Sequence, residues 1–322
     1  MPSNTEKLKK LYTQFSKDDY VLIPVNADPD SIASAMAMKR LLWHRVTGIT
    51  ISNINIVKRP DNLAMIRLLG VKLIPFDKID INNFNNFVLL DSQPAHNQSF
   101  SSLKFSVIID HHPLTDVNAS FTDIRPQYGA TSSIMTEYIK SAKIKPSMKL
   151  ATALFYGIKT DTSNFERQAL PEDMRAFQYL FRFINVTLAR KIEFAEITIQ
   201  FLKYYQIALG NMEIRGNRAY VNLGPVVNPD VCVLIADFFM KIYGIDWTFI
   251  AGLYNENLII IFRNNGIRKD AGKLAKQRFG DIGSAGGHKS VARAEIPLDH
   301  LKDIVDYKTP GKLLRWIIHK TS

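Results

Sequence analysis

Cysteine is nearly absent from this sequence, which contains one, Cys232, among 322 residues. A disulfide within the chain needs two cysteines and a thiolate metal cluster needs several, so neither can stabilise this protein. The first twelve residues also lack the apolar segment of a secretory signal. A reducing compartment fits both observations, and we expect a cytoplasmic protein.

Long hydrophobic runs are absent as well. Apolar stretches such as Leu258–Phe262 have the length of a strand, far below the roughly 20 residues that span a bilayer. With 46% hydrophobic and 22% charged residues, the chain can bury a substantial core, and its length favours two domains. We expect a soluble protein without a membrane partner.

Acidic residues are in deficit: 41 lysines and arginines face 30 aspartates and glutamates, for a formal net charge of +11. The imbalance is uneven, because residues 263–322 contain 13 basic and 6 acidic residues. A positive chain attracts nucleic acid, nucleotides or phosphate esters, and charge alone does not choose among them. A solvated basic surface is the alternative explanation.

The first half of the chain alternates short β-branched runs with segments of helical period, a pattern typical of βαβ units. The expected fold class is α/β, with a doubly wound, largely parallel sheet in an N-terminal domain over residues 1–185. A helical linker over 186–210 joins it to a smaller α/β domain with a mixed sheet over 211–322. In the first domain, strands are predicted at Tyr20–Val25, Ile51–Val57, Val71–Phe76, Phe87–Leu90 and Phe105–Ile109.

Acidic residues follow the predicted strands or helices at four places. Asp28 and Asp30 lie in VNADPDSIAS, Asp91 in VLLDSQP, Asp110 in VIIDHHP and Asp161 in GIKTDTSNF. A lone aspartate after a strand is more often only a turn or cap residue. Together, however, the carboxyl ends of parallel strands open into one crevice, where these carboxylates would repel one another unless a cation neutralises them.

Two adjacent histidines, His111 and His112, follow Asp110 directly after an apolar strand. Capping does not explain this triplet, since adjacent histidines gain nothing from packing at a sheet edge. Mixed oxygen and imidazole ligation suits Mn²⁺, Fe²⁺, Co²⁺ or Zn²⁺ better than Ca²⁺. Two such metals about 3.5–4 Å apart would activate a water and clamp a phosphoryl group.

The order and spacing of DPDSIAS, LLDS, DHHP and GIKTDTSNF resemble the four N-terminal motifs of the DHH phosphoesterase superfamily. FRNN and GSAGGHKSVARAEI resemble its C-terminal DHH-associated domain, and this second domain is similar to that of the nanoRNase and pAp phosphatase branch. The resemblance implies that residues 1–185 form a metal-binding catalytic domain and that residues 211–322 form a substrate-binding domain. It disfavours an inorganic pyrophosphatase.

The resemblance implies two metal sites that share Asp91. The first would add Asp28 and a histidine four residues earlier, where this sequence has Pro24, a residue without a side-chain donor. The amide oxygen of Asn26 or a water could fill the gap, although a neutral oxygen is a poorer ligand than imidazole. A one-metal enzyme is therefore an open alternative. The ligands of the second site would be Asp30, Asp91, His111 and Asp161.

Two catalytic roles also follow from the resemblance. Asp110 would accept a hydrogen bond from an imidazole and set its tautomer, and His112 would be the general acid for the leaving oxygen. The alternative is that His112 is only a structural partner of Asp110. Thr131 and Thr162 would support the metal loops through their hydroxyl groups.

The resemblance assigns substrate binding to the second domain. A predicted loop at Gly286 and Gly287 would let backbone amides approach a phosphate, with His288 adding a donor. Arg263 would clamp the anion through two parallel hydrogen bonds. A Gly-Gly pair alone is more often only a turn, but residues 263–293 hold 8 basic and 2 acidic residues.

The leading hypothesis is a metal-dependent phosphoesterase that hydrolyses a small nucleotide with a metal-activated water. Its substrate would be a short oligonucleotide, pAp or a cyclic dinucleotide, and its cofactor a divalent metal, preferably Mn²⁺, as two ions or as one if Pro24 impairs the first site. The alternative is a non-catalytic protein that binds nucleotide or single-stranded nucleic acid around a degenerate first site. A homodimer is left open.

Overall fold

The computed structural model describes residues 3–166, 169–194, 199–267 and 269–322. The chain divides into two units, Met1–Glu196 and Ile197–Ser322, and each unit has its own sheet and core. Among the helices of these described ranges, none has both the length and the apolar character needed to cross a membrane.

The sheet of the first unit has six strands, β1 (Tyr20–Val25), β2 (Gly48–Asn53), β3 (Leu73–Pro75), β4 (Asn86–Leu90), β5 (Val107–Asp110) and β6 (Phe121–Ile124). All neighbours are parallel, in the order β3-β2-β1-β4-β5-β6. The chain runs outward from β1 to β3 and then places β4 on the other side of β1. Ligands bind such sheets at the carboxyl ends of the strands beside this reversal.

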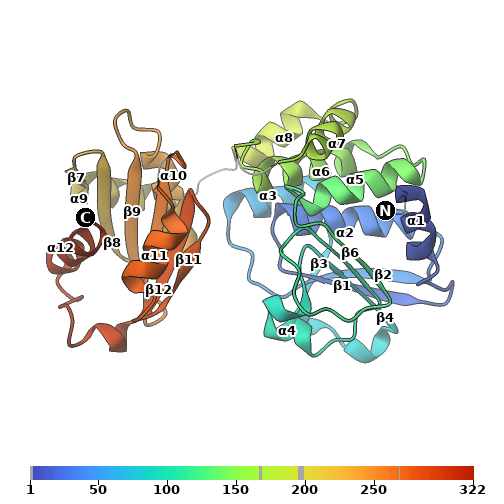
Figure 1. Ribbon diagram of the computed structural model, residues 1–322, viewed down its shortest axis with the longest axis horizontal. Helices are drawn as coiled ribbons and strands as arrows, with labels where there is room; N and C mark the ends of the chain where they lie inside the picture. The colour runs from blue at the N-terminus through green and yellow to red at the C-terminus, as the bar shows by residue number, and fades with distance from the viewer. Residues whose placement is uncertain (1–2, 167–168, 195–198, 268) are drawn as a thin grey trace. The chain divides into compact units, whose positions relative to one another are not determined.

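Helices cover both faces of this sheet and give the unit two cores (Figure 1). Its α-helices are α1 (Asn4–Tyr12), α2 (Pro29–Leu41), α3 (Pro60–Leu69), α4 (Gln98–Ser101), α5 (Thr131–Ser141), α6 (Met148–Asp161), α7 (Pro171–Phe181) and α8 (Val186–Glu193), and short 3-10 turns lie at η1 (Phe76–Lys78), η2 (Ile81–Asn83) and η3 (Pro94–His96). Val88 and Leu90 of β4 face the main core, which includes buried residues of α2, α5 and α6. Leu89 faces the other way, onto Phe100 of α4. This two-sided burial explains the apolar runs of the strands.

The second unit has a mixed six-stranded sheet in the order β11-β12-β10-β9-β8-β7, in which β8 and β9 are parallel and the other neighbours antiparallel. Its elements are α9 (Ile199–Asn211), β7 (Glu213–Arg215), β8 (Arg218–Pro225), α10 (Asp230–Phe239), β9 (Trp247–Tyr254), β10 (Asn257–Asn264), α11 (Ala271–Phe279), β11 (Ser284–Gly287), β12 (Val291–Pro297), η4 (Leu298–Leu301) and α12 (Pro310–Thr321). Side chains of β10 alternate between its two faces. Ile260 and Phe262 belong to the core with Phe279 of α11, and Ile259 belongs to the core with Ile235 of α10.

The predicted α/β fold class is confirmed, and β1 has the predicted bounds. Among the strands of the first unit, the prediction omits β6. The predicted linker over 186–210 contains two helices that pack in different units: α8 contacts α3 and α6, whereas α9 contacts β8 and α10.

Candidate metal centre

Asp28 and Asp30 lie at the start of α2, shortly after β1. Asp28 is the N-cap: its carboxylate accepts the N–H of Ser31 at 2.9 Å, and the Ser31 hydroxyl accepts the N–H of Asp28 at 3.0 Å. Asp30 is fully buried and accepts the backbone N–H groups of Thr131 and Ser132, both at 2.7 Å. The positive N-terminal end of α5 therefore holds this carboxylate.

The other ligand candidates come from the ends of β4, β5 and α6. Asp91 has a left-handed backbone, with φ of 59°, and accepts the hydroxyl of Thr131 at 2.9 Å. His111 lies 3.2 Å through Nδ1 from the carbonyl oxygen of Tyr128. Because a carbonyl only accepts, Nδ1 carries a proton, which makes Nε2 the ring nitrogen that would bind a metal. Asp161 is the last residue of α6.

The Nε2 atom of His111 faces three carboxylates. It lies 3.1 Å from Oδ2 of Asp161, 3.4 Å from Oδ1 of Asp91 and 4.0 Å from Oδ2 of Asp30. One ligand atom from each of these four residues lies within 4.8 Å of the others. Nε2 is buried and has no hydrogen-bond partner in the described part of the chain. A ring nitrogen aimed at three carboxylates fits a cation that all four groups would share, so this donor set suits a divalent metal.

Charge within the cluster is unbalanced. Burial and neighbouring carboxylates raise the pKa of Asp28, Asp91 and Asp161, and raise that of Asp30 to about 6. Burial lowers the pKa of His111, but the carboxylates of Asp161 and Asp30 outweigh it and raise it to about 9. Across the described ranges, the ion pairs of Asp30, Asp91 and Asp161 are all with this one imidazole. A divalent ion would supply the missing positive charge and displace the bound protons.

Asp110 and His112 form a dyad beside this cluster. Oδ1 of the buried Asp110 accepts the Nδ1–H of His112 and the backbone N–H of His111, both at 2.8 Å. Burial by itself raises the pKa of Asp110, but hydrogen bonds from His112 and Gln93 outweigh it and hold that pKa below its usual value. The His112 side chain is 42% exposed, and a ring nitrogen lies within 4.8 Å of ligand atoms of Asp91 and His111. The hydrogen bond predicted between Asp110 and an imidazole is therefore present.

Pro24 is buried inside β1. The carbonyl of Tyr20 accepts the N–H of Asn85, so the backbone of Tyr20 points toward β4. Alternate residues of a strand point toward the same neighbour, so the backbone of Pro24 also points toward β4. The ladder between these strands ends at the pair Leu22 and Phe87, because proline has no N–H with which to extend it. With no donor in its side chain, Pro24 adds no ligand to the carboxylates.

The predicted substrate residues lie in the second unit. Arg263, near the end of β10, is 17% exposed, and its Nε donates to Oδ1 of Asp237 on α10 at 2.7 Å. The sequence predicts a loop at Gly286 and Gly287, but the structure places both in β11, an edge strand paired with β12. A Cβ on Gly287 would lie 2.4 Å from the carbonyl oxygen of Val291, so packing requires glycine there, whereas a Cβ on Gly286 would meet nothing within 4 Å.

A hollow of about 310 Å³ opens beside this edge strand. His288 directly follows β11, and its N–H donates to the carbonyl of Val291 at 2.7 Å. Arg293 of β12 forms an ion pair with Glu295 at 2.6 Å. Its register partner on β10 is Ile261, and because Arg263 lies two residues further along β10, Arg263 and Arg293 lie on the same face of the sheet. The hollow is lined by Ser284, Ala285, Gly286, Arg293 and Glu295.

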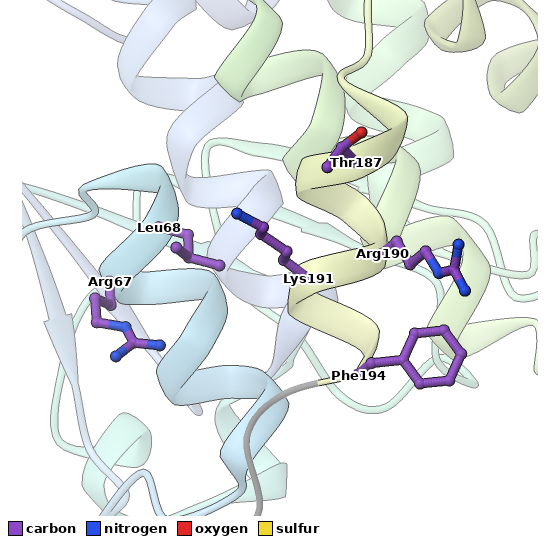
Figure 2. Close-up of a pocket in the computed structure, with 6 residues that line it drawn as sticks. All are labelled: Arg67, Leu68, Thr187, Arg190, Lys191 and Phe194. Atoms are coloured by element: carbon purple, nitrogen blue, oxygen red, sulfur yellow. The ribbon is translucent and has the colours of Figure 1, made fainter.

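Another cavity, of about 450 Å³, lies between α3 and α8 in the first unit (Figure 2). Lys191 points toward α3, whereas Arg190 and Phe194 project from the other side of α8. Its basic side chains therefore do not converge on one point. The predicted site residues all lie in the described ranges, and none of them lines this cavity, whose lining is Arg67, Leu68, Thr187, Arg190, Lys191 and Phe194.

Residues 20–158 match the family model described as the DHH family, N-terminal domain. This region is a DHH-family domain. Asp161 lies just beyond the end of the match, and the other ligand candidates lie inside it. In this DHH domain, the Asp-His-His motif divides its roles: His111 faces the carboxylates, while Asp110 and His112 form the dyad.

Three known proteins illustrate the relationship. An uncharacterized protein of Methanocaldococcus jannaschii is 35% identical over 309 residues, which cover 96% of this chain and 64% of that protein, so the chain spans less than two thirds of this relative's length. The crystal structure of an exopolyphosphatase-related protein from Bacteroides fragilis gives a TM-score of 0.71 at 16% identity and covers 89% of this chain and 90% of its own. RecJ from Thermus thermophilus, solved in complex with Mn²⁺, gives 0.53 at 11% identity and covers 99% of this chain and 54% of its own. The two solved structures share the fold of this chain.

Several residues that build the site do so through groups that sequence motifs do not display. Tyr128 holds His111 through a backbone carbonyl, and Ser132 holds Asp30 through a backbone N–H. Gln93 stands inside a quoted motif, yet its hydrogen bond to Asp110 depends on two separate strands ending side by side. The hydroxyl support predicted for Thr131 is confirmed by its bond to Asp91.

Mn²⁺ should stabilise this protein more at about pH 8 than at about pH 5.5. In the metal-free fold, the raised pKa values of Asp30, about 6, and His111, about 9, give stability that is present at low pH and is lost as pH rises through those values. A bound metal replaces the protons and removes this loss. Thermal melts with Mn²⁺ or with a chelator measure the shift at each pH. Asp77→Asn, at an exposed carboxylate, is the control that should keep it, and an equal shift at both pH values would contradict the expectation.

Gly157 of α6 passes close to Asp30. A Cβ there would lie 2.5 Å from Oγ of Ser132 and 3.1 Å from Cα of Asp30. Gly157→Ala should lower the free energy of unfolding by about 1–3 kcal/mol and weaken Mn²⁺ binding, because Asp30 must move. Gly210→Ala in α9 is the matched control: its Cβ would meet nothing within 4 Å, and the change should raise stability by about 0.5–1 kcal/mol. Urea unfolding and Mn²⁺ titration test both variants, and unchanged stability of Gly157→Ala would refute the close approach.

Proposed function

We propose that this protein is a metal-dependent phosphoesterase that hydrolyses a small nucleotide: a short oligonucleotide, pAp or a cyclic dinucleotide. The convergence of Asp30, Asp91 and Asp161 on the buried Nε2 of His111 carries this proposal. The DHH-family match of the region that supplies most of these residues supports the same reaction class. When bound, a divalent metal, preferably Mn²⁺, would activate water for attack on phosphorus and offset the phosphoryl charge.

In this proposal, the dyad supplies the proton that the leaving oxygen needs. Asp110 occupies Nδ1 of His112, so Nε2 is the ring atom left to hold and transfer a proton. The exposure of the His112 side chain leaves that atom within reach of a substrate. A ribose alkoxide is a poor leaving group, and proton transfer to it is the step that this imidazole would assist.

In this proposal, the second unit binds the phosphate of the substrate. Arg263 and Arg293 lie on one face of its sheet, and each is paired with a carboxylate, of Asp237 and Glu295 respectively. A phosphate would compete for a guanidinium through two charge-assisted hydrogen bonds. The open edge at Gly286 would leave room for this phosphate beside β11. Gly287 and His288, the next two residues, would also contact the phosphate.

The second candidate function is a non-catalytic protein that binds nucleotide or single-stranded nucleic acid. The buried Pro24 favours it, because one predicted metal site then lacks its nitrogen ligand. The four-residue cluster does not include this position, however, and its geometry is intact. A one-metal phosphoesterase is therefore favoured over a protein that only binds.

Turnover of a nucleotide panel decides between these functions. With Mn²⁺, we expect product from at least one of pAp, dinucleotides and cyclic dinucleotides, and no product in excess chelator or with Asp91→Asn, because Asp91 belongs to the metal cluster. Asp77→Asn should keep full turnover. Tight nucleotide binding without turnover under any divalent metal would instead establish the binding protein, and elemental analysis of the loaded protein would count one metal or two.

The role of His112 is tested with two leaving groups. His112→Ala should slow hydrolysis of the best nucleotide substrate by about 10²–10⁴-fold, the usual contribution of a positioned acid. In a 4-nitrophenyl phosphodiester the leaving group is 4-nitrophenolate, which departs without needing a proton. The rate of its hydrolysis should therefore fall far less than that of the nucleotide. Steady-state rates of the variant on both substrates measure this, and equal losses would show that His112 acts in some other way than by protonating the leaving group.

A further inference from the structure

Gln93 lies in the turn after β4, and its side chain is fully buried. Its Nε2 donates to Oδ2 of Asp110 at 2.7 Å and to the carbonyl of Pro113 at 3.0 Å, and it lies 3.4 Å from the carbonyl of His112. Its Oε1 accepts the backbone N–H and the hydroxyl of Thr115, both at 2.7 Å. Every hydrogen-bonding position of this amide is therefore used.

The orientation of this amide is fixed by the chemistry of its partners. A carboxylate and two carbonyls only accept, so they must face the NH₂ group of Gln93. The backbone N–H of Thr115 only donates, so it must face Oε1. Neither glutamate nor a flipped amide satisfies both ends, and asparagine is one methylene too short. This position therefore requires glutamine in the orientation that the structure shows.

The bonds of Gln93 tie the turn after β4 to the segment after β5. Asp110 uses Oδ1 for the Nδ1–H of His112 and Oδ2 for Gln93, so its carboxylate is held from both sides. Without Gln93, Oδ2 would be buried with one donor fewer and the carboxylate would be free to rotate away from the imidazole. The direction of the His112 ring thus depends on the Gln93 amide. This amide reaches the ring through Asp110, and otherwise lies near only the backbone carbonyl of His112.

A second imidazole is fixed by the same residue. The backbone N–H of Gln93 donates to Nδ1 of His96 at 3.2 Å, which leaves the ring proton of neutral His96 on Nε2. The rings of His96 and His112 lie 5.4 Å apart at 75°. The turn after β4 therefore orders both rings, one through a side chain and one through a backbone N–H.

We propose that Gln93 is a positioning residue that sets the orientation and tautomer of His112 through Asp110; its effect on turnover rests on the function proposed above. Within the described part of the chain, the bonds of its side chain reach none of the four metal-cluster residues. Loss of Gln93 should therefore reduce turnover and leave metal binding intact. The four residues that stay unaffected are Asp30, Asp91, His111 and Asp161.

Two substitutions of Gln93 and one control test the proposal. Gln93→Met keeps an unbranched chain of similar length and removes every hydrogen bond of the amide. Gln93→Glu keeps the shape but faces Asp110 with a second carboxylate. Gln98→Met is the matched control, because Gln98 is exposed on the nearby α4. Circular dichroism melts establish that each variant folds.

Both Gln93 variants should lower kcat by about 10–100-fold, as loss of a partner behind a functional group usually does, with KM within about threefold of the original. Mn²⁺ affinity, measured by calorimetry, should stay within about twofold. In histidine labelled with ¹⁵N, the Nδ1–H signal of His112, assigned with His112→Ala, should shift or broaden in both variants and remain in Gln98→Met.

Unchanged kcat in a folded Gln93→Met variant would overturn the proposal, and so would a loss of Mn²⁺ affinity as large as the loss of turnover, which would make Gln93 a support of the metal cluster. The ¹⁵N signal separates this inference from the proposed function. If the original protein hydrolyses nothing but the His112 signal still depends on Gln93, the phosphoesterase fails and the positioning role stands. An unchanged signal in both variants would refute that role even in an active enzyme.

Discussion

Repulsion among buried and half-buried carboxylates is the constraint on which the first unit depends. Asp30, Asp91 and Asp161 share one imidazole as their ion-pair partner across the described ranges, and burial raises the pKa of these three and of the neighbouring Asp28. The fold answers this repulsion with backbone groups: α2 caps itself with Asp28, and the N-terminus of α5 donates two N–H groups to Asp30. The reversal of strand order between β1 and β4 brings these helix starts to the same edge of the sheet. The architecture thus brings the ligands of a candidate cation site together from separate strands and helices.

The sequence predicts the parts of this site that depend on local pattern. Apolar runs and the motifs after them place Asp28, Asp91 and His111 at strand ends, because parallel strands buried on both faces have a recognisable composition. It does not predict β11, since Ser-Ala-Gly-Gly has little preference for strand and pairs only because β12 lies beside it. Nor does it predict which groups orient the ligands. Gln93 and Tyr128 act across strands and turns far apart in the chain, and those contacts exist only once the sheet has formed.

The second unit illustrates a different limit of sequence patterns. A count of basic residues favours anion binding, yet Arg263 and Arg293 are each paired with a carboxylate of their own unit. At these two residues, positive charge in the sequence is therefore not free positive charge, and an anion would have to displace Asp237 or Glu295 to take the guanidinium nitrogens that these carboxylates occupy. Such exchange favours ligands that present two oxygens in the plane of the guanidinium, and it discriminates against weakly charged ones.

The left-handed backbone of Asp91 restricts which amino acids evolution can place there. Aspartate, asparagine and glycine tolerate φ near 59°, whereas β-branched and bulky residues are strained by it. A descendant that abandoned metal chemistry would remain under pressure from the turn itself to keep one of these three. Aspartate at this position in a distant homologue is therefore weak evidence that the homologue has a functional metal centre. Asp161, whose helical backbone accepts almost any side chain and whose carboxylate is 25% exposed, is the position where sequence drift would reveal that the chemistry had been lost.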